Sequence, residues 1–515
     1  MTAADLVLTN ARVITLDPHK PFASLVAIQR DTIKFVGDPD DLGRVSGAGT
    51  KVLDCEGRTV VPGFIDAHCH VFSFLRKLLS VDLSPQSVRS IDDIKQAVRK
   101  KAEQTPIGEW INGTDYNDFY LAEKRHPTRW EIDEVVPDHP VVLSHRSLHA
   151  CVLNSRALAL AGITRETEEP PGGTIERDLA TGEPDGLLLD MLGYIREQVM
   201  PGITGEEIER GIKRASTHYL SRGITSLQDA TVVNDYARWQ KFIRFKEQDL
   251  LKSRLWMMVG TDHLDEFRGA GLGFGSGNNN LRLGGVKITP SETGDTIYPP
   301  QPELDRMVLD IHRAGFRVAI HAIRHETVEA AVTAIERALA EVPVRDHRHR
   351  IEHCSECPPW LLERLKRAGV VVVTQPPFLF YSGERYLATV PADRLPWLYR
   401  IRSLTNAGLT VAGSSDSPIV DDNPLIGIHS AVNRCAETGQ PVLPEEGISP
   451  LEALRMYTAN AAYASFDEHR KGTVTEGKLA DLVLLSDDPV RVTPEAIADI
   501  NVVMTILGGE VAWES

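Results

Sequence analysis

The stretch Val60-Val-Pro-Gly-Phe-Ile-Asp-Ala-His68-Cys-His70 decides the prediction of the fold. Its apolar run predicts a buried strand, and this strand leads directly into two histidines separated by one residue. Side chains two positions apart on a strand point to the same side, so His68 and His70 can reach one ion while Cys69 points away. Two surface histidines in a loop would give the same pattern, and the pair alone does not choose between the two interpretations.

Similar apolar runs recur downstream and alternate with stretches of helical periodicity. The strand-like runs are residues 224–227, 255–259, 285–288, 317–320, 370–373 and 409–412, and the helical stretches are residues 304–314, 327–341 and 360–368. Alternating strands and helices imply an α/β protein with a parallel sheet. Because the alternation extends over roughly 400 residues, it favours a (β/α)8 TIM barrel over a doubly wound sheet.

Both ends of the chain have a different pattern, with short runs rich in β-branched residues. These runs are residues 6–16, 24–30, 32–36 and 51–54 near the start, and 481–485, 502–507 and 510–513 near the end. Each set alone would be marginally stable, so we expect the two to combine into a small β-sandwich. The predicted domains are residues 1–61 and 469–515 for the sandwich and 62–468 for the barrel, with an inserted subdomain at about 106–190.

Composition restricts the partners and the compartment. The 515 residues carry a formal net charge of −16, which disfavours binding to nucleic acid or to anionic lipid. No apolar stretch approaches the ~18 residues of a membrane helix, and no secretory signal is recognisable at the start. The six cysteines do not suggest a disulfide framework. We therefore expect a cytoplasmic protein with reduced thiols, including the Cys354-Ser-Glu-Cys357 pair, for which a redox role is the alternative.

Further polar residues stand directly after predicted strands. His321 follows the run 317–320, His353 follows the run 350–352, and Asp416 follows the run 409–412. The carboxyl ends of barrel strands are where such enzymes gather their functional groups. Imidazole and carboxylate are good ligands for Zn²⁺ and similar ions. These three residues therefore join His68 and His70 as predicted metal ligands.

Several longer motifs give the chain a specific resemblance. The motifs are Pro62-Gly-Phe-Ile-Asp-Ala-His68, Asn154-Ser-Arg-Ala-Leu158, Gly172-Gly-Thr-Ile-Glu-Arg177, Gly223-Ile-Thr-Ser-Leu-Gln-Asp229, Arg348-His-Arg-Ile-Glu-His353, Gly413-Ser-Ser-Asp416 and Gly477-Lys-Leu-Ala-Asp-Leu-Val483. With these motifs the chain resembles the amidohydrolase superfamily, in particular its amidohydrolase-3 branch, which includes N-substituted formamide deformylases. The resemblance covers nearly the whole chain but says little about the substrate.

The resemblance implies additional site residues. Lys287, in Gly284-Gly-Val-Lys287, corresponds to a lysine that CO₂ carboxylates in many relatives and that then bridges two metals. A strand-end lysine paired with an acidic residue is the alternative. His149 matches a histidine of relatives, and together with Arg177 it is a candidate for substrate binding from the insertion. Phe378 and Tyr381 are candidates for an apolar pocket wall, with packing within a loop as the alternative.

Two short segments depart from the pattern of relatives. Where relatives often read His-Ala-Ile-Gly-Asp, this chain reads His321-Ala-Ile-Arg324-His325. Where relatives often have Asp-Gly soon after the lysine, this chain continues Ile288-Thr-Pro-Ser-Glu-Thr. Both departures lie beside predicted ligands, so they bear on the contacts around the metal and on substrate preference.

The predicted activity is hydrolysis of an amide, formamide or cyclic amide C–N bond in a small molecule. One or two divalent ions, with Zn²⁺ favoured, would activate water, and Asp416 would act as the general base. His325 and Glu352 are the next candidates for the base. An esterase or lactonase, a decarboxylase, or a non-catalytic binding homologue would fit the same barrel. A serine hydrolase is disfavoured because no GxSxG motif is present, and a homodimer is left open.

Overall fold

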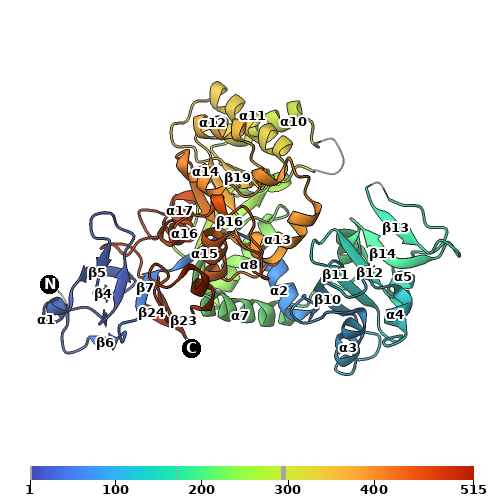
Figure 1. Ribbon diagram of the computed structural model, residues 1–515, viewed down its shortest axis with the longest axis horizontal. Coiled ribbons are helices and arrows are strands. Elements are labelled where there is room, and N and C mark those ends of the chain that lie inside the picture. The colour runs from blue at the N-terminus through green and yellow to red at the C-terminus, as the bar shows by residue number, and fades with distance from the viewer. Residues whose placement is uncertain (1–2, 171, 292–296) are drawn as a thin grey trace. The chain divides into compact units, whose positions relative to one another are not determined.

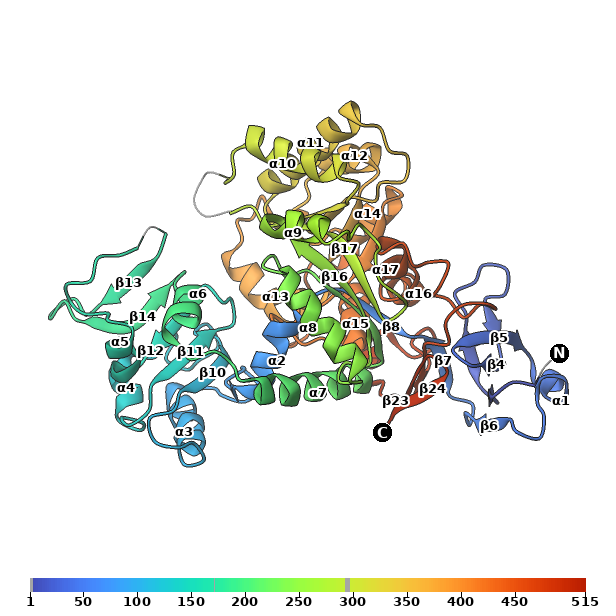
Figure 2. The same cartoon turned by 180° about the vertical axis from the view of Figure 1, so that it is seen from behind.

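The computed structural model describes residues 3–170, 172–291 and 297–515. The chain divides into two units, one formed by residues 1–71 with 216–515 and the other by residues 72–215. Figure 1 and Figure 2 show the first unit with its N-terminal strands in blue and its C-terminal strands in red. Four sheets account for the strands of the described residues.

The first unit is built around a parallel barrel of eight strands. In sheet order these are β21 (Thr410–Gly413), β20 (Val371–Thr374), β19 (Arg350–His353), β18 (Val318–Ala322), β17 (Leu281–Ile288), β16 (Arg254–Gly260), β15 (Ile224–Asp229) and β8 (Phe64–Cys69). The first and last strands meet, because Asp416 donates its N–H to the His68 carbonyl at 2.8 Å and Cys69 forms a parallel bridge with Ser417. The predicted (β/α)8 barrel is confirmed.

Helices cover the outside of the barrel and follow the predicted pattern. The helices α10 (Gln301–Arg313), α11 (His325–Glu341) and α12 (Pro359–Ala368) correspond to the three predicted helical stretches. Helix α12 begins with a proline at its first position, and it ends at Gly369, whose φ of 65° is left-handed. Both residues suit those positions, because proline presets the first turn and glycine adopts a left-handed cap without a Cβ penalty.

The two ends of the chain form the β-sandwich. One sheet contains β5 (Thr32–Gly37), β4 (Leu25–Gln29), β1 (Leu6–Thr9) and β6 (Lys51–Asp54), and the other contains β24 (Glu510–Glu514), β23 (Val502–Leu507), β22 (Leu482–Leu485), β7 (Thr59–Pro62), β2 (Arg12–Ile14) and β3 (Phe22–Ala23). Both sheets contribute to one buried core that includes Leu8, Val26, Val60 and Leu484. The chain ends join directly, because β7 pairs antiparallel with β22.

Two predicted runs are each divided by the tertiary structure. The run 6–16 breaks at Asn10, whose φ is 51°, into strands that belong to different sheets. The run that begins at Val60 breaks at Gly63 into β7 of the sandwich and β8 of the barrel. A Cβ at Gly63 would lie 2.2 Å from the Thr225 hydroxyl, so the chain can pass there only without a side chain.

The second unit has its own sheet and its own core. The strand order is β13 (Thr174–Arg177), β14 (Pro184–Leu189), β12 (Ala150–Leu153), β11 (Val141–His145), β10 (Ile111–Tyr116) and β9 (Val81–Asp82). Helix α3 (Ile91–Ala102) buries Ile94 and Val98 in the same core as Ile111. This unit therefore extends beyond the predicted insertion 106–190 at both ends. The domain limits proposed above stay a prediction.

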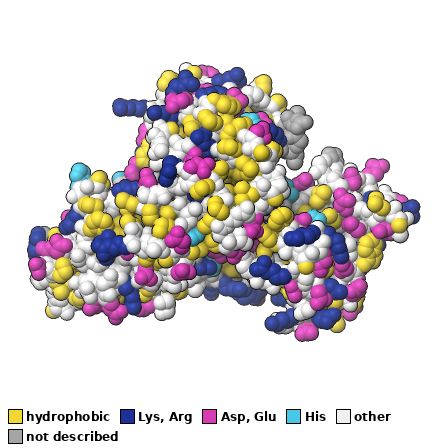
Figure 3. Space-filling model, in the orientation of Figure 1, with side chains coloured by type: hydrophobic (Ala, Val, Ile, Leu, Met, Phe, Trp, Pro, Cys, Tyr) yellow, Lys and Arg dark blue, Asp and Glu magenta, His cyan; other side chains and the backbone are white. Residues whose placement is uncertain are grey.

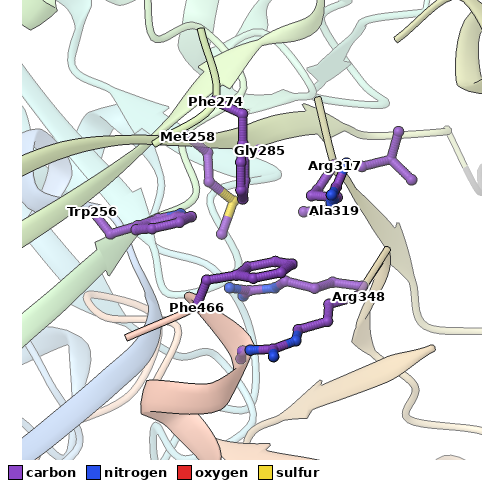
Figure 4. Close-up of a pocket in the computed structure, with 11 residues that line it drawn as sticks. Trp256, Met258, Phe274, Gly285, Arg317, Ala319, Arg348 and Phe466 are labelled. Carbon is purple, nitrogen blue, oxygen red and sulfur yellow. The ribbon is translucent and has the colours of Figure 1, made fainter. Parts of the chain in front are cut away.

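The amino end of the barrel is packed with aromatic and arginine side chains. Trp256, Phe274, Phe466, Arg317 and Arg348 surround a cavity of about 10 Å³ there (Figure 4), which is room for about one water molecule. The Arg348 guanidinium lies 4.1 Å from the centre of the Phe466 ring, and the Arg317 guanidinium lies 5.2 Å from that of Phe274. These cation–π contacts stabilise the amino end of the barrel.

The surface carries charges of both signs. Basic and acidic side chains are interspersed on the face seen in Figure 3. In the part of the chain that the structure describes, no helix is both long enough and apolar enough to cross a bilayer.

Candidate metal centre

The carboxyl ends of the barrel strands carry all six predicted ligands. His68 lies in β8 and His70 directly follows that strand, whereas Lys287, His321 and His353 lie in β17, β18 and β19. Asp416 follows β21 by three residues. Because parallel strands end at the same rim of a barrel, residues far apart in the sequence meet there.

Three of these residues form a tight group. Within the described residues, ligand atoms of His68, His70 and Asp416 all lie within 4.8 Å of one another. Asp416 Oδ1 is 3.0 Å from His70 Nε2 and 3.4 Å from His68 Nε2. This geometry presents two imidazole nitrogens and one carboxylate oxygen to a common point.

The other two histidines stand next to this group. The ring centres of His68 and His353 are 4.9 Å apart, and those of His353 and His321 are 4.4 Å apart. Lys287 is buried close by, since its charge acts on both His68 and His353 and it is itself acted on by Asp416. The structure therefore brings the six predicted ligands together, while their roles stay predictions.

The Nδ1 atom of three of these histidines has a hydrogen-bond partner. His70 Nδ1 is 2.9 Å from Thr231 Oγ1, and His353 Nδ1 is 2.8 Å from Gln375 Oε1. His68 Nδ1 is 2.5 Å from Glu352 Oε2. These bonds orient the rings and leave each Nε2 for a ligand, which is the usual arrangement around a protein-bound metal. The donor set therefore fits a divalent ion such as Zn²⁺.

Burial also favours the ligand form of these side chains. Burial lowers the pKa of His68 and of His353 well below the usual value, and the nearby charge of Lys287 lowers the pKa of His68 further. Neutral imidazole is the form that binds metals. Burial likewise lowers the pKa of Lys287 to about 8, which increases the fraction of its neutral amine.

A buried carboxyl holds the loop of Asp416 in place. Asp66 Oδ2 accepts the Ser415 hydroxyl at 2.5 Å, and Asp66 Oδ1 accepts the N–H groups of Ser415 at 3.1 Å and of His68 at 3.2 Å. Burial raises the pKa of Asp66 to about 7. Asp416 itself has a left-handed φ of 61°, a conformation that persists only where the surroundings enforce it.

The predicted substrate-binding residues of the second unit have local partners. His149 is exposed, and its Nδ1 lies 2.7 Å from Asp190 Oδ1. Arg177 donates hydrogen bonds to the backbone carbonyls of Thr164, Thr167 and Gly182. These contacts stabilise the loops that contain Thr164, Thr167 and Gly182. The substrate-binding roles of His149 and Arg177 stay predictions.

The aromatic stretch beyond β20 is helical. Phe378 and Tyr381 lie in α13 (Pro377–Thr389). The expectation of a loop at these residues is therefore wrong. Phe378 stacks on Tyr399 with ring centres 6.5 Å apart, within an apolar cluster that includes Leu379 and Val442. Tyr381, three residues further along the same helix, lies beside Phe380 at a ring-centre distance of 5.1 Å. Their roles toward substrate stay predictions.

Arg324 and His325, which depart from the family pattern, take part in an ion network. His325 Nδ1 is 3.2 Å from Glu326 and 3.3 Å from Glu356, and Arg394 lies 3.6 and 3.8 Å from the same two carboxylates. Arg324 also pairs with Glu326, at 3.3 Å. The carboxylates are thus matched by arginines rather than left for a second cation. Of the other departing segment, Glu292 and Thr293 lie outside the described residues.

The CxxC cysteines are free buried thiols. A side-chain hydrogen bond with Cys357, together with burial, raises the pKa of Cys354 well above its usual value. A raised pKa disfavours the thiolate that redox chemistry requires.

Sequence reasoning did not single out most of the side chains that support the histidines. These are Asp66, Thr231, Arg350 and Gln375, with Glu352 considered only as a substitute base. Arg350 and Glu352 carried a readable signal, since two charged residues alternate within the short strand Arg350-Ile-Glu-His353. Charged side chains on the interior side of a buried strand need partners, and here each serves as the other's partner.

Comparison with known proteins identifies the family. The sequence model of the amidohydrolase family matches residues 51–512. The chain belongs to the amidohydrolase family. This amidohydrolase is 30% identical, over an alignment 540 positions long, to an N-substituted formamide deformylase of Arthrobacter pascens, and the alignment covers 99% of this chain and 98% of that protein. It is also 30% identical to the Arabidopsis thaliana protein LONG AFTER FAR-RED 3, with 98% of this chain and 91% of that protein covered.

A solved structure agrees with this assignment. The crystal structure of an uncharacterized metal-dependent hydrolase from Pyrococcus furiosus superimposes with a TM-score of 0.75 at 26% sequence identity, and it covers 94% of this chain and 100% of that chain. The expected family and the expected enzyme class, an amidohydrolase, are confirmed. Metal dependence is a property of this family, and the group of His68, His70 and Asp416 is the candidate site for the ion.

Proposed function

We propose that this amidohydrolase cleaves a C–N bond of an amide, formamide or cyclic amide in a small molecule, by attack of water. The observation that carries the proposal is the convergence of His68, His70 and Asp416 at the carboxyl rim of the barrel. The relative named N-substituted formamide deformylase, which aligns along nearly the whole chain, supports the choice of bond.

The ion in this proposal is Zn²⁺, held by the six residues His68, His70, Lys287, His321, His353 and Asp416. Nitrogen and carboxylate ligands suit zinc, and the bonded Nδ1 atoms leave Nε2 as the ligand atom of His68, His70 and His353. A divalent ion bound there lowers the pKa of water towards neutrality and polarises a carbonyl oxygen.

Lys287 would serve as a carboxylated ligand that allows two ions to bind. An ordinary ammonium group repels a cation, whereas a lysine carboxylated by CO₂ offers anionic oxygens. The reaction requires the neutral amine, and the burial of Lys287 shifts its equilibrium towards that form. Without carboxylation, the site would hold one ion.

Asp416 would move the proton. Its Oδ1 lies beside the Nε2 atoms of both His68 and His70, so the carboxylate faces the place where water and substrate meet. It would accept a proton from the attacking water and then give it to the leaving nitrogen. Glu352 is less suited to this role because both of its oxygens accept bonds from Arg350.

The test combines metal analysis with a substrate panel. Protein stripped by a chelator should lose hydrolysis of N-formyl and N-acyl compounds and should regain it with Zn²⁺, Co²⁺ or Mn²⁺. A lactone and a carboxylic ester serve as matched substrates that lack the C–N bond. Undiminished hydrolysis by metal-free protein would refute the metal-dependent mechanism. Turnover of the lactone alone would replace the amide with an ester as the substrate class.

A further inference from the structure

Glu352 is enclosed by donors at the centre of the barrel. Its Oε1 accepts the Arg350 Nε–H at 2.6 Å, and its Oε2 accepts an Arg350 Nη2–H at 2.9 Å. The same Oε2 lies 2.5 Å from His68 Nδ1. Both charged side chains are buried, with 5% exposure for Arg350 and none for Glu352. Alternation along β19 turns both of them to the barrel interior.

These bonds determine the tautomer of His68. A carboxylate whose oxygens accept from Arg350 can only accept from the imidazole as well, so the proton of His68 is on Nδ1. The lone pair is therefore on Nε2, which is the nitrogen that faces Asp416 at 3.4 Å. The other tautomer would direct an N–H to the point where a cation is expected, and it would not bind one.

Arg350 is in turn anchored to the opposite side of the barrel. Its Nη1 donates to Gln228 Oε1 of β15 at 2.5 Å, and its Nη2 donates to the Ala67 carbonyl of β8 at 2.7 Å. The amide of Gln228 is oriented by the bond from its Nε2 to the Ala461 carbonyl at 2.8 Å. A connected set of hydrogen bonds thus runs from the helix α17 (Ala459–Ala464) to His68.

We propose that Arg350 and Glu352 act as a positioning pair that sets the tautomer and the orientation of His68 for metal binding. The inference rests on the proposed function, because it assigns His68 Nε2 to a metal. Neither residue touches the ion in this proposal. Arg350 compensates the buried charge of Glu352, which would be costly alone, and it holds the carboxylate in the one orientation that meets His68. Partners of this kind change metal affinity by about 10–100-fold.

The decisive variant is Glu352→Gln in the full-length protein. If the amide oxygen keeps the Arg350 bond, the amide NH₂ faces His68 Nδ1, which favours the wrong tautomer. Zn²⁺ affinity, measured by competition with a chromophoric chelator on the stripped protein, should fall by about 10–100-fold. The visible absorption spectrum of the Co²⁺-loaded protein should change as well, because it reports the ligand geometry at the ion.

Asp481→Asn provides the matched control. Asp481 forms a bidentate pair with Arg254 at 2.7 and 2.9 Å, and the two side chains are 3% and 7% exposed, close to the values for Glu352 and Arg350. Removal of this carboxylate should lower the melting temperature without changing Zn²⁺ affinity or the Co²⁺ spectrum. A loss of affinity that is equal in both variants would indicate a general structural effect and would overturn the inference.

The remaining outcomes separate this inference from the proposed function. Wild-type affinity and spectrum in Glu352→Gln would overturn the positioning role alone. Failure of the wild-type protein to bind any divalent ion would refute the proposed function and, with it, this inference. Arg350→Lys, which keeps the charge but not the two-bond geometry, is the second variant and should also weaken binding. If neither variant folds, a Zn²⁺-bound wild-type crystal structure decides, and coordination of His68 through Nδ1 would overturn the inference.

Discussion

Asp416 Oδ1 lies 3.0 Å from His70 Nε2, although the two residues are 346 positions apart in the chain. The contact joins the first and the last barrel strands at their carboxyl ends. Two backbone bonds secure it, from the Asp416 N–H to the His68 carbonyl and from the His70 N–H to the Ser417 carbonyl, each at 2.8 Å. The contacts that close the barrel therefore also bring Asp416 next to His68 and His70 in the candidate site.

Asp416→Asn should separate metal binding from proton transfer. The amide keeps the shape and one ligand oxygen but cannot accept the proton from water. We expect most of the metal to remain and kcat to fall by about 10²–10⁴-fold. Metal analysis and steady-state kinetics test this, with Asp421→Asn as the control because Asp421 is half-exposed and pairs only loosely with Arg222, at 3.6 Å. A near-normal kcat in Asp416→Asn would assign the base to another group.

Lys287→Ala should reduce the metal content. If the carboxylated lysine bridges two ions, the variant should bind at most one and should lose most of its activity, and a short carboxylic acid should restore part of it. Lys471→Ala is the control, since Lys471 is another buried lysine, paired with Asp467 at 3.3 Å. That variant should lose stability but keep its metal. Unchanged metal content and rate in Lys287→Ala would indicate a mononuclear site without lysine.

Stability should decrease in mild acid because of a buried histidine. His349 Nδ1 accepts the Val318 N–H at 3.0 Å, so its Nε2 carries the proton and donates to His312 Nδ1, also at 3.0 Å. Burial and the neighbouring charges of His347 and His312 lower the pKa of His349 well below its usual value. Below a pH of about 6.5, the unfolded chain therefore binds more protons than the folded protein does. The free energy of unfolding has its full value above that pH and declines as the pH falls.

The size of this effect can be measured by denaturation at several pH values. A histidine that stays neutral in the folded state contributes a loss of roughly 1.5 kcal/mol between pH 6.5 and pH 5. His349→Gln should remove that share of the pH dependence, whereas His469→Gln, which changes an exposed histidine, should not. The same pH dependence in all three proteins would show that His349 does not contribute.

Gly284→Ala should destabilise the barrel. A Cβ at this position of β17 would lie 2.0 Å from Trp256 Nε1 and 2.5 Å from its Cδ1, and the buried indole has little room to move. Overpacking of this kind costs about 1–3 kcal/mol. Gly49→Ala is the control, because nothing lies within 4 Å of its Cβ position. Thermal unfolding of both variants measures the difference, and equal melting temperatures would contradict the predicted clash.

Much of the fold was readable from local patterns. The apolar runs of the barrel are short and buried along nearly their whole length, and each predicted ligand follows or ends such a run, as His353 does on β19. The breaks at Asn10 and Gly63 were not readable, because each depends on which sheet the next residues join. The helix that contains Phe378 and Tyr381 was not among the predicted helical stretches, although prolines such as Pro377 suit a first helical turn.

The sequence by itself indicated the family, the barrel and the positions of the six predicted ligands. The strand pattern and the places of five ligands at strand ends are local properties, whereas the family and Lys287 were predicted from the resemblance of longer motifs. Only the tertiary structure decided how those ligands are supported. Glu352 and His68 are 284 positions apart, and Gln228 and Arg350 are 122 apart, so no local pattern indicates that they meet. They meet because closure of the barrel brings opposite strands together in an interior where every buried charge requires a partner.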